Sequence, residues 1–220
     1  MTSLNFNALK KDLYAAVLSD VLDSFGLMNQ AMRPFIRPLD DAQVLFGRAR
    51  TGLYMNAYSV AEGENPYEVE IALVDDLKPG DVAVLDCGGP TERIAPWGEL
   101  LSTASAKRGA AGCVIDGLVR DVRMIREMQF PVFHGGIGPL DTKGRAKMMA
   151  RDVPVSCGGV AVSSGDLIFG DVDGVVVIPQ AIAPQVIEAA IAKVKSENVT
   201  RDELNRGLLL GEVYRKYGVL

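Results

Sequence analysis

Apolar residues recur along the chain with two periods, and each period predicts a different element. At residues 8–25 they fall three or four apart and stop at Gly26, which predicts an amphipathic helix ending there. Residues 65–77 show the helical period again, whereas residues 44–54 alternate as a strand does. Short apolar runs that follow turn residues predict further strands. These strands cover residues 82–85, 113–115, 131–134, 156–162, 167–169 and 175–178.

A helix is predicted between the first two of these short strands. Residues 98–108 carry an apolar stripe, basic side chains suit the last turn, and Gly109 is a suitable C-cap. A strand, a helix and a strand within about 35 residues form a βαβ crossover unit, whose two strands are expected to be neighbours.

The chain is predicted to end in helices. Pro184 begins one that runs to about Lys195, and Thr200 with Glu203 forms a capping box for another. No linker or low-complexity segment divides the sequence, so residues 1–220 are expected to form one α/β domain. The tail helix from about residue 200 is expected to serve assembly.

Composition narrows the class of protein. With 220 residues, of which 48% are hydrophobic, the chain can bury a sizeable core. The net charge of −5 and the lack of basic runs argue against nucleic acid as a partner. No export signal or membrane span is expected, because the first residues lack the pattern of a signal peptide and no long apolar run occurs. The three separated cysteines predict reduced thiols and a cytoplasmic protein.

Histidine usage restricts the chemistry. The single histidine is His134, so a Ser-His-Asp triad is conceivable only around that position, and a multi-histidine zinc or iron site is excluded. A bound metal ion would have to be held by oxygen ligands.

Two strand ends are candidates for a ligand site, because ligands of α/β sheets gather where strands end and helices begin. One is the loop of residues 87–99, which leads from the strand at 82–85 into the helix at Gly98. The other follows the strand at 113–115 and leads to Arg120 and Asp121. If the two strands are neighbours, both segments open on the same edge.

The residue types at this edge suit a 2-oxo acid. Asp121 is a hard oxygen ligand for Mg²⁺ or Mn²⁺, Arg120 can clamp an oxyanion, and Glu99 could hold the metal's water molecules. Backbone amides at a helix start can bind a carboxylate, and together the set would stabilise an enolate. These amides belong to Gly98, Glu99, Leu100 and Leu101.

Each of these features also has an ordinary structural interpretation. An adjacent Arg-Asp pair in a turn is commonly a solvated pair, and Glu99 is favourable at a helix start without any function. Asp116 is interpreted as a turn residue before Gly117. His134 is interpreted as structural and Trp97 as a packing residue.

The run "WGELLSTASAKRGAAGCVIDGLVRD" resembles the signature of a known family. That family joins the class II 4-hydroxy-4-methyl-2-oxoglutarate / 4-carboxy-4-hydroxy-2-oxoadipate aldolases to the regulator of ribonuclease activity A. The aldolase signature is an acidic residue, twenty residues and then Arg-Asp, and Glu99, Arg120 and Asp121 keep that spacing. The resemblance extends through "PVFHGGIGPLDTKGR" and "VSSGDLIFGDVDGVVVIP", and so covers most of residues 45–200.

The resemblance implies a fold, an assembly and an activity. The fold would be a single-domain α/β/α swivelling-type sandwich with a compact β core and C-terminal helices, assembled as a trimer or hexamer with sites at subunit interfaces. The activity would be retro-aldol release of pyruvate and decarboxylation of oxaloacetate, both through the pyruvate enolate.

The resemblance also implies roles for individual residues. Asp121 would be the metal ligand, Arg120 would contact substrate and stabilise the enolate, and residues 98–101 would bind substrate through the backbone. Glu99 stands where many members have aspartate. A carboxylate from a neighbouring subunit would lie near the metal's water shell, and Glu197 is the candidate.

Three rival functions follow from the same residues. One is a structural or assembly protein whose site is vestigial. A Schiff-base aldolase would need Lys107 or Lys143 to be activated by burial. A protein-binding regulator of a ribonuclease would lack catalysis, and members of that branch tend to depart from the acidic and Arg-Asp positions that this chain keeps. The sequence leaves open the physiological 2-oxo acid, the metal, and the roles of Arg123 and His134.

Overall fold

A computed structural model describes residues 5–88 and 93–218 of the chain. Its β core is a sheet with strand order β1-β5-β4-β3-β2-β9-β10, to which β6 is added alongside β2, and a separate hairpin of β7 and β8. The strands are β1 (Arg37–Pro38), β2 (Leu45–Asn56), β3 (Asp81–Asp86), β4 (Gly112–Val119), β5 (Val132–Ile137), β6 (Ala146–Arg151), β7 (Val155–Cys157), β8 (Val160–Val162), β9 (Leu167–Asp171) and β10 (Gly174–Ile178).

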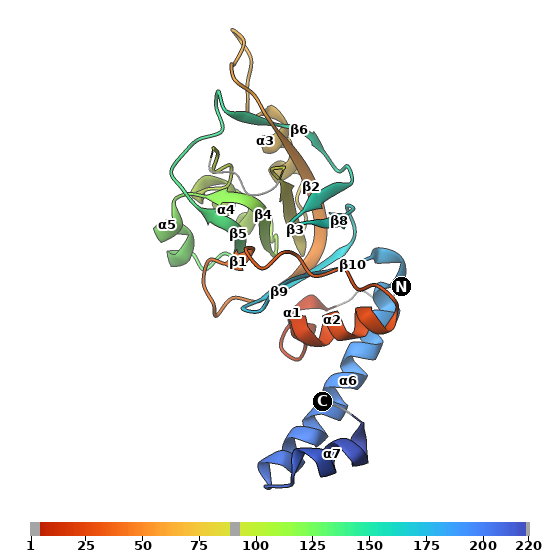
Figure 1. Cartoon of the computed structure of the whole chain (residues 1–220). Helices are drawn as coiled ribbons and strands as arrows, with labels where there is room; N and C mark the ends of the chain where they lie inside the picture. Colours follow the sequence, from red (N-terminus) through yellow and green to blue (C-terminus); the bar gives the residue numbers. More distant parts are fainter. Residues whose placement is uncertain (1–4, 89–92, 219–220) are drawn as a thin grey trace.

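Helices lie on both sides of this β core (Figure 1). Helices α3, α4 and α5 pack over one apolar cluster, and α2 and α6 pack over another. The helices are α1 (Phe6–Leu9), α2 (Ala15–Ser24), α3 (Glu68–Asp75), α4 (Glu99–Lys107), α5 (Val122–Glu127), the 3₁₀ turn η1 (Gln180–Ile182), α6 (Ala183–Asn205) and α7 (Leu210–Tyr217). None of the helices in the described part of the chain has both the length and the apolar character needed to span a bilayer.

The sheet curves into a nearly closed barrel. Arg37 and Pro38 form β1, the first strand in this order, and pair with β5. Ala31, a few residues earlier, bridges Val176 of β10, the last strand in the order. The segment before β1 therefore connects the first and last strands of the sheet. A third apolar cluster, which includes Val84, Val114 and Phe133, fills the inside of the sheet. The predicted α/β/α layers are confirmed, with the β layer curved rather than flat.

The predicted βαβ unit positions the candidate site. Strands β3 and β4 are parallel neighbours, with Val82 opposite Gly112 and Leu85 opposite Ile115, and α4 connects them. Strand β5 continues the parallel set on the far side of β4. The carboxyl ends of these three strands therefore open on one edge of the sheet.

The first helix was predicted as one element, and this is wrong. The chain forms α1 and then turns before α2, because Tyr14 is extended and Ala15 N donates a hydrogen bond of 2.8 Å to the Asp171 carboxylate. That carboxylate satisfies an amide at the start of α2, which local periodicity cannot predict. The predicted end is confirmed: α2 stops at Ser24, and Gly26 takes a positive φ of 78°.

One predicted strand is corrected, and one strand was missed. Residues 156–162 form the hairpin β7–β8, because Gly158 and Gly159 at its turn both have positive φ, at 56° and 82°. Strand β6 was not predicted at all. It pairs antiparallel with the second half of β2, a partner distant in sequence.

The predicted capping box at Thr200 is also wrong. Helix α6 continues through this residue to Asn205 and ends before Gly207, whose φ is 92°. Thr200 is buried inside the helix, so its side chain caps nothing. The tail helix thus begins at residue 183, and its far half projects from the sheet and carries α7 (Figure 1).

Asp116 is a strand residue rather than a turn residue. Strand β4 runs on to Val119, and Asp116 is only 1% exposed within it. Its carboxylate accepts hydrogen bonds from Cys87 N at 2.7 Å and Gly158 N at 3.2 Å. The aspartate therefore ties the β7–β8 hairpin to the end of the sheet. The three cysteines are free thiols, and Cys113 and Cys157 are buried.

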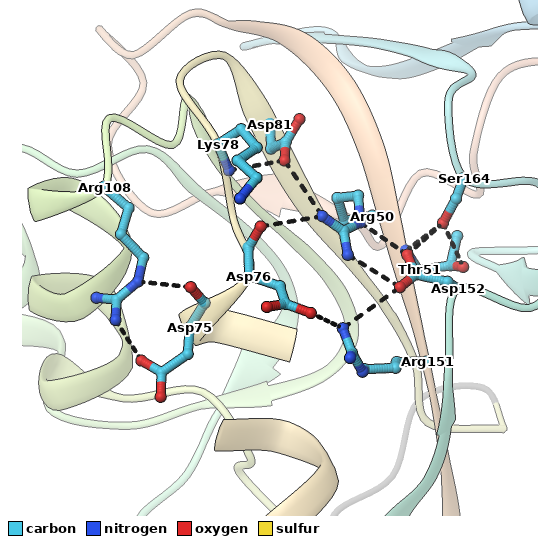
Figure 2. A network of polar contacts seen from close by, with 10 residues as sticks. All are labelled: Arg50, Thr51, Asp75, Asp76, Lys78, Asp81, Arg108, Arg151, Asp152 and Ser164. Carbon is cyan, nitrogen blue, oxygen red and sulfur yellow. Dashed lines mark hydrogen bonds and ion pairs between the residues drawn. The ribbon is translucent and has the colours of Figure 1, made fainter. Parts of the chain in front are cut away.

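A network of ion pairs and hydrogen bonds lies at the start of β3, at the opposite end of the strand from the candidate site (Figure 2). Arg50 of β2 binds the Asp152 carboxylate twice, with Nε–Oδ1 at 2.7 Å and Nη2–Oδ2 at 2.9 Å. It also donates to the Asp76 carbonyl at 3.2 Å and lies 3.6 Å from Asp81 Oδ2. One guanidinium therefore joins β2, β3, the end of α3 and the end of β6.

Replacing Arg50 with methionine is expected to lower the free energy of unfolding by roughly 1–3 kcal/mol. The guanidinium lowers the pKa of Asp152 chiefly through its hydrogen bonds. A carboxylate whose pKa is lower in the folded than in the unfolded protein stabilises the fold at pH values above its unfolded pKa of about 3.9. The difference in unfolding free energy between the wild type and the variant should therefore shrink as the pH falls below about 4. Urea unfolding at several pH values measures this. Arg123→Met is the control, since Arg123 is 88% exposed, and a loss as large in the control would contradict the assignment.

Candidate active site

The start of α4 lies against the end of β4. Arg120 N donates a hydrogen bond of 2.9 Å to the Trp97 carbonyl, and Trp97 bridges Val119 in parallel register. Trp97 is 1% exposed, and its indole nitrogen donates to Ser102 Oγ at 2.8 Å. It is therefore a packing residue, as predicted, and it holds Gly98 beside Arg120 and Asp121.

Asp121 faces the first amide of α4. Its Oδ2 accepts a hydrogen bond of 3.1 Å from Glu99 N. The residue has a φ of 59°, in the left-handed region that aspartate tolerates better than most residues. The predicted juxtaposition of the Arg-Asp pair with the helix start is therefore present.

Gly98 is required by this close approach. A Cβ at this position would lie 2.5 Å from Asp121 Oδ2 and 3.2 Å from Arg120 Cγ. Only glycine lets the backbone come so near to both side chains. Of the other predicted backbone contributors, Leu100 is 78% exposed and Leu101 is partly buried.

Arg120 lies between two carboxylates. Its Nη2 is 3.2 Å from Asp141 Oδ1, and its Nε is 3.9 Å from Asp121 Oδ2. The Nε atom is shielded from solvent and makes no hydrogen bond within the described part of the chain. The guanidinium is therefore held on one side and has donor capacity left over.

Two residues that sequence reasoning missed complete the surroundings of Arg120. Asp141 lies four residues after β5, and the Tyr67 hydroxyl donates to Asp141 Oδ2 at 2.5 Å. The rule that ligands gather at the ends of parallel strands would have pointed to Asp141, because β5 is parallel to β4. Nothing in the sequence indicated Tyr67.

The ionisation of these groups follows from their surroundings. Burial, and then the hydrogen bond to Asp141, raises the pKa of Tyr67 to about 12. Burial works to raise the pKa of Asp141, but the hydrogen bonds from Tyr67 and the Lys143 amide and the charge of Arg120 outweigh it and lower that pKa. Near neutral pH a protonated phenol therefore donates to a charged carboxylate.

The carboxylates of the other predicted site residues, Glu99 and Glu197, each have a partner of their own within the chain. Glu99 Oε1 accepts a hydrogen bond of 2.6 Å from Thr103 one helical turn on. Glu197 accepts a hydrogen bond from Tyr14 and lies 3.6 Å from Lys193, so within its own chain it belongs to the α2–α6 packing. In the predicted loop of residues 87–99, positions 89–92 lie outside the described residues.

His134 lies on β5, one of the strands of the curved sheet. Burial, and then the charge of Arg126, lowers its pKa to about 4, so the ring is neutral near pH 7. Its Nδ1 has no hydrogen-bond partner among the described residues. Lys107 and Lys143 are both exposed, so burial activates neither of them as a Schiff-base nucleophile.

Comparison with known proteins gives the family. The RraA-like family model, described as Aldolase/RraA, matches residues 15–177. The chain therefore belongs to the RraA-like family. A relative from Halalkalibacterium halodurans, named "Putative 4-hydroxy-4-methyl-2-oxoglutarate aldolase", is 36% identical over 80% of this chain and 77% of its own length.

Solved structures give the same fold. An uncharacterized protein from Pseudomonas syringae superposes with a TM-score of 0.80 at 26% identity, covering 94% of this chain and 96% of that one. RraAS2 of Streptomyces coelicolor, described as an unusual member of the RNase ES inhibitor RraA protein family, superposes with a TM-score of 0.78 at 26% identity, covering 91% and 99%. Aldolase names and a ribonuclease-inhibitor name thus both occur among the relatives.

Proposed function

We propose that this protein is a divalent-metal-dependent lyase. It would cleave 4-hydroxy-4-methyl-2-oxoglutarate or 4-carboxy-4-hydroxy-2-oxoadipate by a retro-aldol reaction to release pyruvate, and would decarboxylate oxaloacetate. The observation that supports this most is the meeting of Asp121, Arg120 and the first amide of α4 at one edge of the sheet, with Glu99 N 3.1 Å from Asp121 Oδ2. These are the groups that a 2-oxo acid and a hard cation need.

The residues fit a cation that is held by few protein ligands. Among the described residues, no group of three or more His, Cys, Asp or Glu side chains could enclose a metal ion. Mg²⁺ keeps several water molecules and commonly binds through one or two carboxylates plus the substrate. Asp121, whose side chain is 36% exposed, suits that mode and would be the protein ligand.

Other groups of the chain would bind the substrate and stabilise the negative charge that forms during the reaction. Of the backbone amides at residues 98–101, that of Glu99 donates to Asp121, and those of Gly98, Leu100 and Leu101 would bind the substrate carboxylate at the positive end of α4. Arg120 would donate to the carbonyl oxygen and stabilise the negative charge that develops there as the carbon–carbon bond breaks. When bound, the cation would supply Lewis-acid polarisation of the same carbonyl.

A pyruvate-coupled assay with a panel of substrates tests the proposed function. The panel contains oxaloacetate and several 4-hydroxy-2-oxo acids, each measured after EDTA treatment and after addition of Mg²⁺ or Mn²⁺. We expect release of pyruvate from at least one member when the metal is present. Turnover that survives EDTA, or borohydride trapping of a lysine adduct, would point to the Schiff-base mechanism instead.

A second function is favoured by the likeness to RraAS2. The protein would bind a ribonuclease and inhibit it without catalysis. Against this stands the retention of Glu99, Arg120 and Asp121 at one edge of the sheet. Stoichiometric inhibition of a ribonuclease, together with no pyruvate from any panel member, would favour this second function.

A further inference from the structure

The guanidinium of Arg120 lies near two carboxylates, those of Asp141 and Asp121. It is 3.2 Å from Asp141 and 3.9 Å from Asp121 in its two closest ion pairs, so the nearer carboxylate is the one that would not hold the metal. A guanidinium that closed fully on Asp121 would compete with a cation for the same oxygen atoms. Asp141 therefore draws the arginine away from the proposed metal ligand.

Asp141 is itself held from two directions. The Tyr67 hydroxyl donates to its Oδ2 at 2.5 Å, and Lys143 N donates to the same atom at 3.3 Å. Oδ1 is left for Arg120. The carboxylate thus has a fixed orientation, with one oxygen atom for its supports and one for the guanidinium.

Tyr67 is anchored by the helix that it precedes. Glu70, three residues later in the chain, is 8% exposed and accepts a hydrogen bond of 2.6 Å from the hydroxyl of Tyr54, which is 3% exposed. This buried contact ties α3 to β2, so the start of α3 is set relative to the sheet. The core thus fixes the start of α3, Tyr67 at that start binds Asp141, and Asp141 binds Arg120.

We infer that Asp141 and Tyr67 are positioning residues that set the orientation of Arg120 for stabilising the enolate. This inference rests on the proposed function. Neither residue needs to touch the substrate. Asp141 binds one Nη atom of a group with five N–H donors, which leaves other donors for the oxyanion. Groups that hold a site residue in place commonly change activity by 10- to 100-fold when they are removed.

Kinetics of Asp141→Asn and Tyr67→Phe test the inference. We expect Asp141→Asn to lower kcat by about 10- to 100-fold while KM changes by less than about 3-fold, because the substrate carboxylate still binds the amides. Tyr67→Phe should lower kcat by about 3- to 10-fold. Since Tyr67 acts through Asp141, the double variant should resemble Asp141→Asn alone. Asp75→Asn, which removes a surface carboxylate paired with Arg108, is the matched control.

Two further measurements separate positioning from other roles. Hydrogen exchange at the Arg120 Nη2 protons, which lie against Asp141, is followed by nitrogen-15 NMR and should quicken in Asp141→Asn. Mn²⁺ affinity should stay within about 3-fold of the wild-type value. Unchanged exchange would overturn the inference, because Asp141 would then not hold the guanidinium. A large loss of Mn²⁺ affinity would also overturn it and would place Asp141 at the metal's water shell. If the wild type released no pyruvate, the proposed function would fail on its own, while the exchange experiment would still decide the Asp141–Arg120 contact.

Discussion

Replacing Asp121 with alanine is expected to lower kcat/KM for pyruvate release by at least about 1000-fold. The reason is that this carboxylate is the proposed protein ligand of the metal, and its loss removes the cation that polarises the substrate carbonyl. The measurement is the coupled assay at saturating Mn²⁺, accompanied by a titration of Mn²⁺ binding followed by electron paramagnetic resonance. The variant should bind the ion far more weakly than the wild type does.

Asp23→Ala is the control for this experiment. Asp23 is an exposed aspartate on α2, away from the end of β4, and its loss should leave turnover and Mn²⁺ binding unchanged. Near wild-type activity in Asp121→Ala would remove the proposed metal ligand from the mechanism. Because Asp121 also accepts the Glu99 amide, circular dichroism should first establish that the variant is folded.

Arg120→Lys is expected to lower kcat by about 100- to 1000-fold, which is the usual cost of removing one oxyanion donor. Lysine keeps the positive charge but lacks the planar fork that can bind Asp141 and an oxyanion at the same time. The substitution therefore separates charge from geometry. Initial rates across a range of substrate concentrations give kcat and KM separately.

Arg108→Lys is the matched control for Arg120→Lys. Arg108 pairs with Asp75 in the network shown in Figure 2, and the same change of chemistry there should leave kcat unaltered. If Arg120→Lys kept most of the wild-type kcat, charge alone would be sufficient and the oriented guanidinium would have no special role.

The central part of the candidate site could be predicted because it depends on residues that are close together in the sequence. A βαβ unit brings the end of one strand and the start of the next helix to the same edge, so Gly98 and the Arg-Asp pair had to be near each other once β3 and β4 were neighbours. The turn residues around the short strands were equally local signals. These features need only a few consecutive residues.

The remaining features depend on contacts between distant segments. Tyr67 reaches Asp141 across 74 residues of sequence, and Ala15 is capped by Asp171 across 156 residues. Thr200 and Glu203 form a recognisable capping pattern, yet Thr200 lies buried within α6, whose helix continues past it. Asp116 shows the same principle, because a polar residue is accommodated in a buried strand by backbone amides from elsewhere in the chain.

The most direct test of the account is pyruvate release by metal-stripped protein before and after Mn²⁺ is restored. The account predicts that the stripped protein is inactive on the best 2-oxo acid substrate and that turnover rises with Mn²⁺ until one ion is bound per chain. Pyruvate release that continues at the same rate without any divalent metal would contradict it.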